Sequence, residues 1–245
     1  MIRRFSLITA VAVLAIVLST AAYVLRAPAE ASETIAAIPL VQEQAAGSSS
    51  ETTDAETATT AEADVQSAGE ILFEINEDNA QAGFALGEVL RGTQTTVVGI
   101  TDQVAGQISF DPADLSTVQI GIFRVDARTL ATDSDMRDRA IQNEILDTGS
   151  YEYITFTPAD VAGLPDSIGV GETISFTISG DLTIRDVTQP VTFAVTATFV
   201  SENELTGTAS ATIARDDYNL TIPSVPQVAG VDDAVEIIVD FAASA

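Results

Sequence analysis

Apolar and polar residues alternate with a period of two through most of residues 71–241. Successive side chains of a β-strand point to opposite faces of the sheet, so this period predicts strands with one buried and one solvated face. Threonine occupies many of the polar positions, and it combines a high β-propensity with a surface that water wets. The clearest runs place apolar residues at Ile174, Phe176, Ile178, Leu182 and Ile184, at Val191, Phe193, Val195, Ala197 and Phe199, and at Val235, Ile237, Val239 and Phe241.

The segments between these runs carry signals for short antiparallel connections. Residues 185–190 are expected to form a turn, and Pro190 to open the next strand, where a missing N–H is tolerated. Asp111-Pro112 should end a strand, and residues 201–204 should form a tight connection. An earlier run shares one parity, and its members are expected to face the same side: Val98, Ile100, Val104, Ile108 and Phe110. The pattern predicts an all-β fold, an antiparallel β-barrel of about eight or more strands.

One segment, residues 133–146, breaks the alternation. It contains helix formers, acidic residues in its first turn, and Asp133 or Ser134 as a candidate N-cap. We expect one short helix over about residues 135–145, capping one end of the barrel.

An apolar run of 21 residues, from 5 to 25, follows Arg3 and Arg4. A helix of that length spans the hydrocarbon core of a bilayer, and the basic residues favour the cytoplasmic side. Residues 1–25 are therefore expected to form a transmembrane anchor or a cleaved signal peptide. Either alternative places the rest of the chain outside the cytoplasm, in the periplasm or at the cell exterior. The run is long for a signal peptide, so we expect residues 5–25 to tether the protein to the membrane.

Residues 26–68 differ from both neighbouring regions in composition. They are rich in alanine, threonine, glutamate and serine, and they contain no aromatic residue. Such a segment buries too little apolar surface to offset its ordering entropy, so it is expected to be a disordered linker. As a flexible coil of about 43 residues it would reach on the order of 35–40 Å. Residues 69–245 remain as one barrel domain.

Several residue types that carry common chemistry are missing. The chain has no cysteine, no histidine and no lysine, and its formal net charge is −26. Without these side chains the usual thiolate, imidazole and Schiff-base mechanisms and most metal sites are excluded, which leaves only carboxylate chemistry open. The acidic charge disfavours nucleic acid and makes membrane contact by charge unfavourable. We expect no catalytic residues, no metal site, no cofactor and no nucleic-acid partner, and membrane contact through the N-terminal segment only.

A closed barrel of about eight strands is just wide enough to be filled by side chains or to hold one ligand. Periodicity does not distinguish these cases, but small inward residues favour a cavity, and Gly207, Ala209 and Ala211 are of this kind. The residues expected to line such a pocket are Phe84, Leu86, Phe123, Ile141, Ile145, Phe156, Phe176, Ile178, Phe193 and Val195.

Four stretches, taken in order, resemble the YceI-like family of exported, polyisoprenoid-binding, lipocalin-like proteins. They lie at residues 106–120, 136–156, 180–191 and 211–220. Residues 180–191 are the most similar, to a pattern of the form G-x-L-T-I-x-G-V-T-x-P-V. The chain departs from the family at Asp186 (usually Gly), Glu152 (usually Pro) and Arg139 (where a His is common).

The resemblance implies a lipocalin-like barrel that holds a polyprenyl chain or an isoprenoid quinone and performs no catalysis. Burying about 500 Å² of such a chain would contribute on the order of 12 kcal/mol before ordering costs. The alternative is a cell-surface interaction module whose barrel is filled and binds no lipid.

Overall fold

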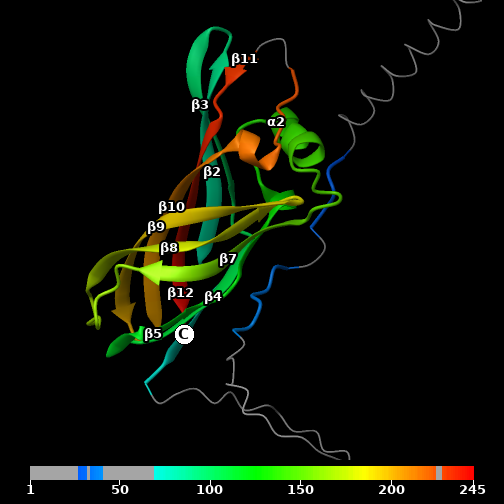
Figure 1. Cartoon of the computed structure of the whole chain (residues 1–245). Helices are drawn as coiled ribbons and strands as arrows, with labels where there is room; N and C mark the ends of the chain where they lie inside the picture. Colours follow the sequence, from blue (N-terminus) through cyan, green and yellow to red (C-terminus); the bar gives the residue numbers. More distant parts are fainter. Residues whose placement is uncertain (1–26, 32–33, 41–68, 225–227) are drawn as a thin grey trace, which may run out of the picture.

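The computed structural model describes residues 27–31, 34–40, 69–224 and 228–245. The chain from residue 71 onward forms an antiparallel β-barrel with a short helix at one end (Figure 1). The strands are β1 (Ile71–Ile75), β2 (Ala80–Leu90), β3 (Thr93–Thr101), β4 (Val104–Asp111), β5 (Asp114–Ile120), β6 (Phe123–Asp126), β7 (Tyr153–Ala162), β8 (Thr173–Ile184), β9 (Val187–Ser201), β10 (Glu204–Ala214), β11 (Val228–Val231) and β12 (Ala234–Ser244). The helical segments are η1 (Ala127–Thr129), α2 (Asp135–Ala140), η2 (Ile141–Ile145) and η3 (Arg215–Tyr218).

This architecture confirms the predicted all-β barrel with one short helix. The predicted N-terminal membrane or signal segment lies outside the described residues. Among the residues that are described, no helix is both long and apolar enough to cross a membrane.

Eight strands close the ring in the order β1-β4-β6-β7-β8-β9-β10-β12. The closing contact between β1 and β12 is the single pair Glu74 and Ser244, because β2 occupies the same edge of β12 over residues 236–241. Strand β2 in turn pairs with β3 and β11, so the sheet extends beyond the ring at the end that carries α2. The longest pairing joins β8 to β9 and runs from Thr173 opposite Thr198 to Ile184 opposite Val187.

The β8–β9 connection is shorter than the sequence predicted. Strand β9 begins at Val187, so the turn consists of Arg185 and Asp186, and Arg185 adopts a positive φ of 59°. Pro190 therefore lies inside β9 rather than opening it. At that point β9 pairs with β8 alone, since its pairing with β10 begins at Ala194. A locally free edge tolerates a missing N–H donor, which explains the position of this proline.

The prediction that Val98 and Ile100 face the same side as Val104 was wrong. Val98 is 52% exposed and Ile100 44% exposed, whereas Val97 and Val104 are buried. The cause is the tight turn between β3 and β4, across which the inward positions change from odd to even residue numbers. Alternation counted straight through a tight turn therefore assigns one of the two flanking strands to the wrong face.

The predicted helix is confirmed as α2 followed by the π-helical turn η2, together spanning residues 135–145. Ser134 is the N-cap residue, but its side chain makes no capping hydrogen bond. Instead Oδ1 of Asp138 accepts hydrogen bonds from the backbone N and the hydroxyl of Thr132, at 2.8 and 2.6 Å. The buried side chain of Gln142 then ties the helix to the barrel, because its Nε2 donates to the carbonyls of Arg128 and Leu130 at 2.9 and 3.0 Å.

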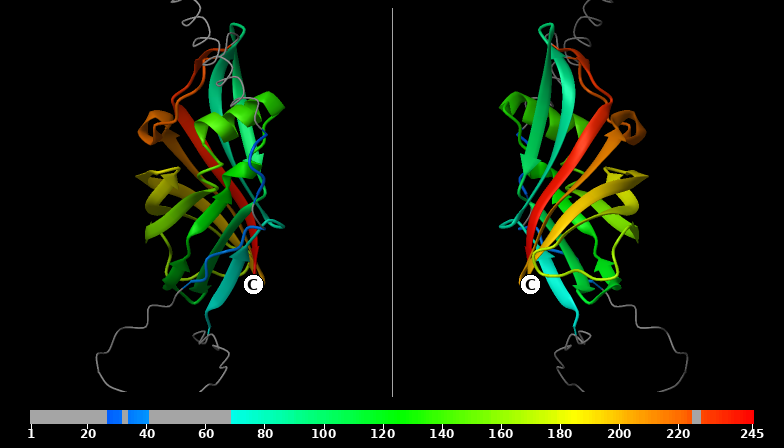
Figure 2. Two further views of the ribbon diagram at one scale, coloured as in Figure 1. Left: turned by 90° about the vertical axis from the view of Figure 1, so that its right-hand side faces the viewer. Right: turned by 90° about the vertical axis from the view of Figure 1, so that its left-hand side faces the viewer.

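Two short pieces of the predicted linker, residues 27–31 and 34–40, lie against the barrel, and we call them the N-terminal strap. The strap runs along the outer wall from the α2 end towards β5 (Figures 1 and 2). Ile35 is 5% exposed, and the backbone N of Leu40 donates to Oε1 of Gln107 at 2.9 Å. These residues therefore depart from the expectation of one free linker over residues 26–68, and residues 41–68 lie outside the described part of the chain.

Candidate ligand-binding cavity

The barrel encloses a cavity of about 600 Å³. This volume falls within the usual range for sites that hold a small organic ligand. Its wall is almost entirely apolar and is built from the inward positions of the barrel strands together with one side of α2 and η2. The polar residues on the wall all lie towards the α2 end: Glu88, Ser134, Arg137, Glu144, Arg215 and Ser224.

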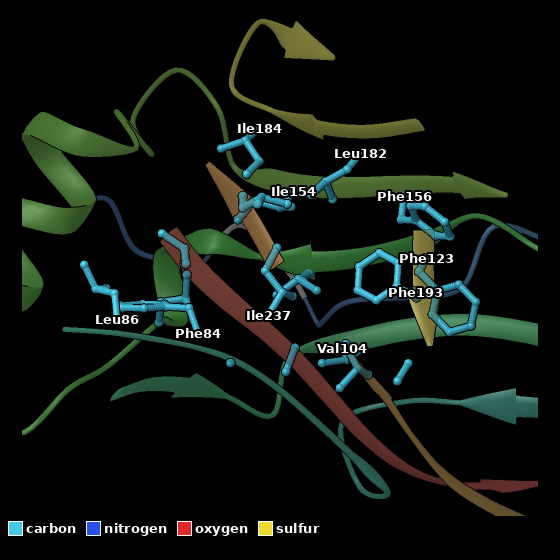
Figure 3. Close-up of a pocket in the computed structure, with 18 of the residues that line it drawn as sticks. Phe84, Leu86, Val104, Phe123, Ile154, Phe156, Leu182, Ile184, Phe193 and Ile237 are labelled. Atoms are coloured by element: carbon cyan, nitrogen blue, oxygen red, sulfur yellow. The ribbon is translucent and has the colours of Figure 1, made fainter. Parts of the chain in front are cut away.

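All ten residues predicted to line a pocket do line this cavity. They come from β2 (Phe84, Leu86), β6 (Phe123), η2 (Ile141, Ile145), β7 (Phe156), β8 (Phe176, Ile178) and β9 (Phe193, Val195). Figure 3 shows that Phe123, Phe156 and Phe193 gather around one part of the interior, while Phe84 and Leu86 lie nearer the helix. That these side chains contact a ligand stays a prediction.

Sequence reasoning missed other wall residues, which Figure 3 also shows. Among them are Val104 of β4, Ile154 of β7, Leu182 and Ile184 of β8, and Ile237 of β12. The signal was present, because each follows the alternation of its strand. What the sequence did not give was how far along each strand the hollow part of the interior extends.

Three phenylalanine rings close the end of the cavity opposite α2. The Phe73 and Phe110 rings stack with their centroids 5.3 Å apart, and the Phe199 ring meets both edge-on, at 6.3 and 5.8 Å. Phe110 lines the cavity, whereas Phe73 and Phe199 are buried behind it at 0% and 2% exposure. Edge-to-face and offset-stacked rings pack densely. The cavity is therefore blind at this end.

Glycines under aromatic rings keep the middle of the barrel open. A Cβ at Gly106 would lie 2.7 Å from the ring of Phe123, so that ring lies directly over the glycine. The ring of Phe84 covers Gly99 in the same way. The ring of Phe241 covers Gly207 in the same way, 2.7 Å from where a Cβ would be, so the room that Gly207 leaves is taken by this ring rather than directly by a ligand. Of the other small residues considered, Ala209 lines the cavity, while Ala211 is buried but not part of its wall.

The mouth of the cavity lies beside α2. Among the lining residues only Met136 and Ser224 are exposed, and Met136 is 78% exposed. Next to them, Arg137 Nη2 forms an ion pair with Glu88 Oε1 at 3.1 Å, and Arg137 also pairs with Asp133. The Glu88 side chain is only 7% exposed, so this pair is largely buried. It connects α2 to β2 across one side of the mouth.

Burial raises the pKa of Tyr218 and of Asp126, neither of which lines the cavity. Burial, assisted by the nearby Asp217 charge, raises the pKa of Tyr218 to about 12. Burial also raises the pKa of Asp126, against a hydrogen bond from the backbone N of Arg128 that lowers it. Within the described ranges no three metal-binding side chains cluster together. The cavity thus offers an apolar space with polar groups at one end.

The comparisons with known proteins agree with this geometry. A family model described as a YceI-like domain matches residues 73–243. No curated protein sequence matches the chain.

Solved structures share the fold at low sequence identity. A polyisoprenoid binding domain from Saccharophagus degradans, implicated in plant cell wall breakdown, has a TM-score of 0.57 and 16% identity, covering 71% of this chain and 98% of that one. Burkholderia cenocepacia BcnA has a TM-score of 0.54 and 18% identity, covering 70% and 99%. A mutant of the Campylobacter jejuni YceI protein has a TM-score of 0.50 and 18% identity, covering 60% and 84%.

Proposed function

Since the chain belongs to the YceI-like family, we propose that its barrel binds a single polyisoprenoid or isoprenoid quinone. The role is that of a non-catalytic carrier or store. The observation that carries this proposal is the blind apolar cavity of about 600 Å³ whose polar groups are confined to the mouth.

The chemistry of an isoprenoid fits this distribution of polarity. Its chain is apolar along its whole length, so it needs no polar partner in the interior, where an unpaired polar group would be costly to bury. Its one polar end would lie at the mouth, beside groups such as Ser134 and Arg137. The similar domain from Saccharophagus degradans is itself described as polyisoprenoid binding, which supports the proposed ligand class.

The alternative, an interaction module with a filled barrel, is less compatible with the hollow interior. A filled core requires inward side chains to meet at native packing density, leaving few voids larger than a water molecule. The cavity is many times larger than that.

Mass spectrometry of lipid extracted from the purified full-length chain tests the proposal. We expect about one isoprenoid per chain. A matched pair of variants on β10 makes the test specific: Ala209→Phe fills the cavity, while Thr208→Phe adds the same ring on the exposed outer face. Ala209→Phe should lower the lipid content several-fold and Thr208→Phe should leave it unchanged. A wild-type chain without lipid, or equal lipid in both variants, would overturn the proposal, and a circular dichroism melt verifies that each variant is folded.

Export and membrane tethering form part of the same proposal. The support is the apolar run of residues 5–25 after Arg3 and Arg4. Protease added to intact cells or spheroplasts should digest the barrel, and the chain should stay with the membrane after carbonate extraction. A chain protected from external protease would contradict export, and release by carbonate would favour a cleaved signal peptide over an anchor.

A further inference from the structure

The N-terminal strap is fixed to the barrel at the same end as the cavity mouth. Its first piece meets the barrel where the carbonyl of Glu30 accepts a hydrogen bond from Nη1 of Arg128 at 3.1 Å. Farther along, Ile35 is buried, and Leu40 is held by Gln107 on β4. The strap therefore passes from the α2 end down the outer wall (Figure 2).

The point where the strap begins is coupled to the structure around the mouth. The carbonyl of Arg128 accepts from Nε2 of Gln142, and so does the carbonyl of Leu130. Gln142 belongs to η2, whose neighbouring residue Ile141 lines the cavity, as Leu130 does. Arg128, which holds Glu30, is thus directly hydrogen-bonded to η2, the segment that caps the barrel.

The strap also shortens the tether between the barrel and the proposed membrane anchor. Glu30 lies five residues after Leu25, the end of the apolar run. At about 3.3–3.6 Å per residue, these five steps span at most about 18 Å. A free linker of the length expected from the sequence would reach on the order of 35–40 Å and would let the barrel rotate.

We propose that the N-terminal strap holds the mouth of the cavity towards the lipid bilayer that residues 5–25 enter. The inference rests on the proposed function and on membrane anchoring. In this orientation an isoprenoid passes between the bilayer and the cavity with little exposure of its chain to water. The exposed Met136 at the mouth then lies on the face nearest the membrane.

Charge does not orient the mouth towards the membrane, so the orientation must come from the tether through the N-terminal strap. The formal net charge of −26 repels anionic headgroups. The mouth itself carries Asp133 and Asp135 beside Arg137 and Arg139, so it has no excess of positive charge that would draw it to a membrane.

The absence of cysteine from the sequence allows a direct test with single introduced labels. Met136→Cys places a fluorophore at the mouth, and Val170→Cys places one at the opposite end, where the next residue, Gly171, donates its backbone N–H to the carbonyl of Phe199. The full-length labelled chains are reconstituted in phosphatidylcholine vesicles that contain an acceptor-labelled lipid. The 12 residues of β8, at about 3.3 Å each, separate the two ends by up to about 40 Å. We expect several-fold stronger energy transfer from position 136 than from position 170.

A pair of strap variants tests the cause. Ile35→Asp places a charge at a buried position and should release the strap, whereas Ile38→Asp changes a residue that is already 38% exposed. We expect Ile35→Asp to reduce the difference between the two label positions at least twofold, and Ile38→Asp to preserve it. Since neither residue belongs to the barrel, lipid content by mass spectrometry should be unchanged in both.

The outcomes separate this inference from the proposed function. Equal transfer from positions 136 and 170 in the unsubstituted strap, no effect of Ile35→Asp, or a chain that does not associate with vesicles would each overturn the inference. Lipid found in a barrel that has no preferred orientation overturns the inference alone. An oriented barrel that never contains lipid overturns the proposed function and leaves the orientation standing.

Discussion

Replacing Gly106 with alanine tests whether glycine beneath an aromatic ring keeps the cavity open. The added Cβ would lie 2.7 and 2.8 Å from two atoms of the Phe123 ring, and that ring is the only group it would meet at such short range. Carbon atoms in contact prefer a separation of about 3.5–4.0 Å. The ring must therefore retreat by roughly 1 Å, and the free space available to it is the cavity that it lines.

The magnitude of the Gly106→Ala effect follows from two opposing contributions. Forcing an extra carbon into a packed position costs about 1–3 kcal/mol. Exchanging glycine for alanine within a strand contributes about 0.5–1 kcal/mol in the other direction, because the unfolded chain loses freedom. We expect the free energy of unfolding to fall by about 0.5–2 kcal/mol, which is about 1–8 °C in Tm at about 2–4 °C per kcal/mol for a domain of this size. Lipid content should fall as well, because the displaced ring enters the cavity.

Urea unfolding measures the stability change, with an unchanged m value as the condition for comparing midpoints. Gly230→Ala in β11 is the matched control, since a Cβ there meets nothing within 4 Å and the backbone does not require positive φ. Phe123→Leu, introduced into the Gly106→Ala variant, should recover part of the loss because the smaller side chain relieves the contact. If Gly106→Ala is as stable and binds as much lipid as Gly230→Ala, then the glycine beneath the Phe123 ring does not keep the cavity open.

Three further predictions concern polar side chains of the barrel. Arg137→Gln leaves the buried Glu88 carboxylate without its cationic partner and should lower the free energy of unfolding by about 3 kcal/mol. Adding Glu88→Gln to this variant should restore part of the lost stability. If the effects of the two substitutions simply add in this double-mutant cycle, the two residues are not coupled. Because burial raises the pKa of Asp126 above its unfolded value of 3.8, the wild type should lose stability relative to Asp126→Asn as the pH rises from about 4 through the folded pKa; parallel urea midpoints across this range would count against the shift. The pKa of Tyr218 is raised to about 12 from 10.0, so stability should fall between pH 10 and 12 in the wild type and not, from this cause, in Tyr218→Phe. At neutral pH Tyr218→Phe should cost little, since the Tyr218 hydroxyl has no hydrogen-bond partner among the described residues, and a large loss would show that it does.

The long strands of the barrel were predictable because alternation over ten or more residues leaves one consistent inward set. Strands β8 and β9 show this, with Ile178 and Val195 buried as expected. Shorter strands joined by tight turns were less predictable. The errors at Val98 and Ile100 arose because the turn between β3 and β4 restarts the alternation, and the sequence pattern is apolar on both sides of it.

The N-terminal strap could not be predicted from periodicity at all. Its contacts with the barrel include one buried side chain, Ile35, and two hydrogen bonds that involve its backbone at Glu30 and Leu40. Backbone groups are the same in every sequence, and the few large apolar residues of the strap, Ile35, Ile38 and Leu40, do not form a regular period of two. Composition predicts only that such a segment cannot form a core of its own. It does not show that a finished barrel offers the segment a surface on which to lie.

Whether the barrel is hollow depends on which residues face each other in neighbouring strands. The alternation of apolar and polar residues within one strand does not show which residues of the next strand lie opposite. A filled barrel and a hollow one can present the same inward sequence of valine, isoleucine and phenylalanine. Here the difference is made where a large ring covers a missing side chain: Phe84 lies opposite Gly99 in the β2–β3 register, and Phe241 lies opposite Gly207 in the β10–β12 register. Each ring occupies the gap that its glycine leaves in the wall, so less of its volume is taken from the interior. Recognising such a pair requires the strand register, and register is fixed by turns and bulges whose lengths the sequence pattern gave least well.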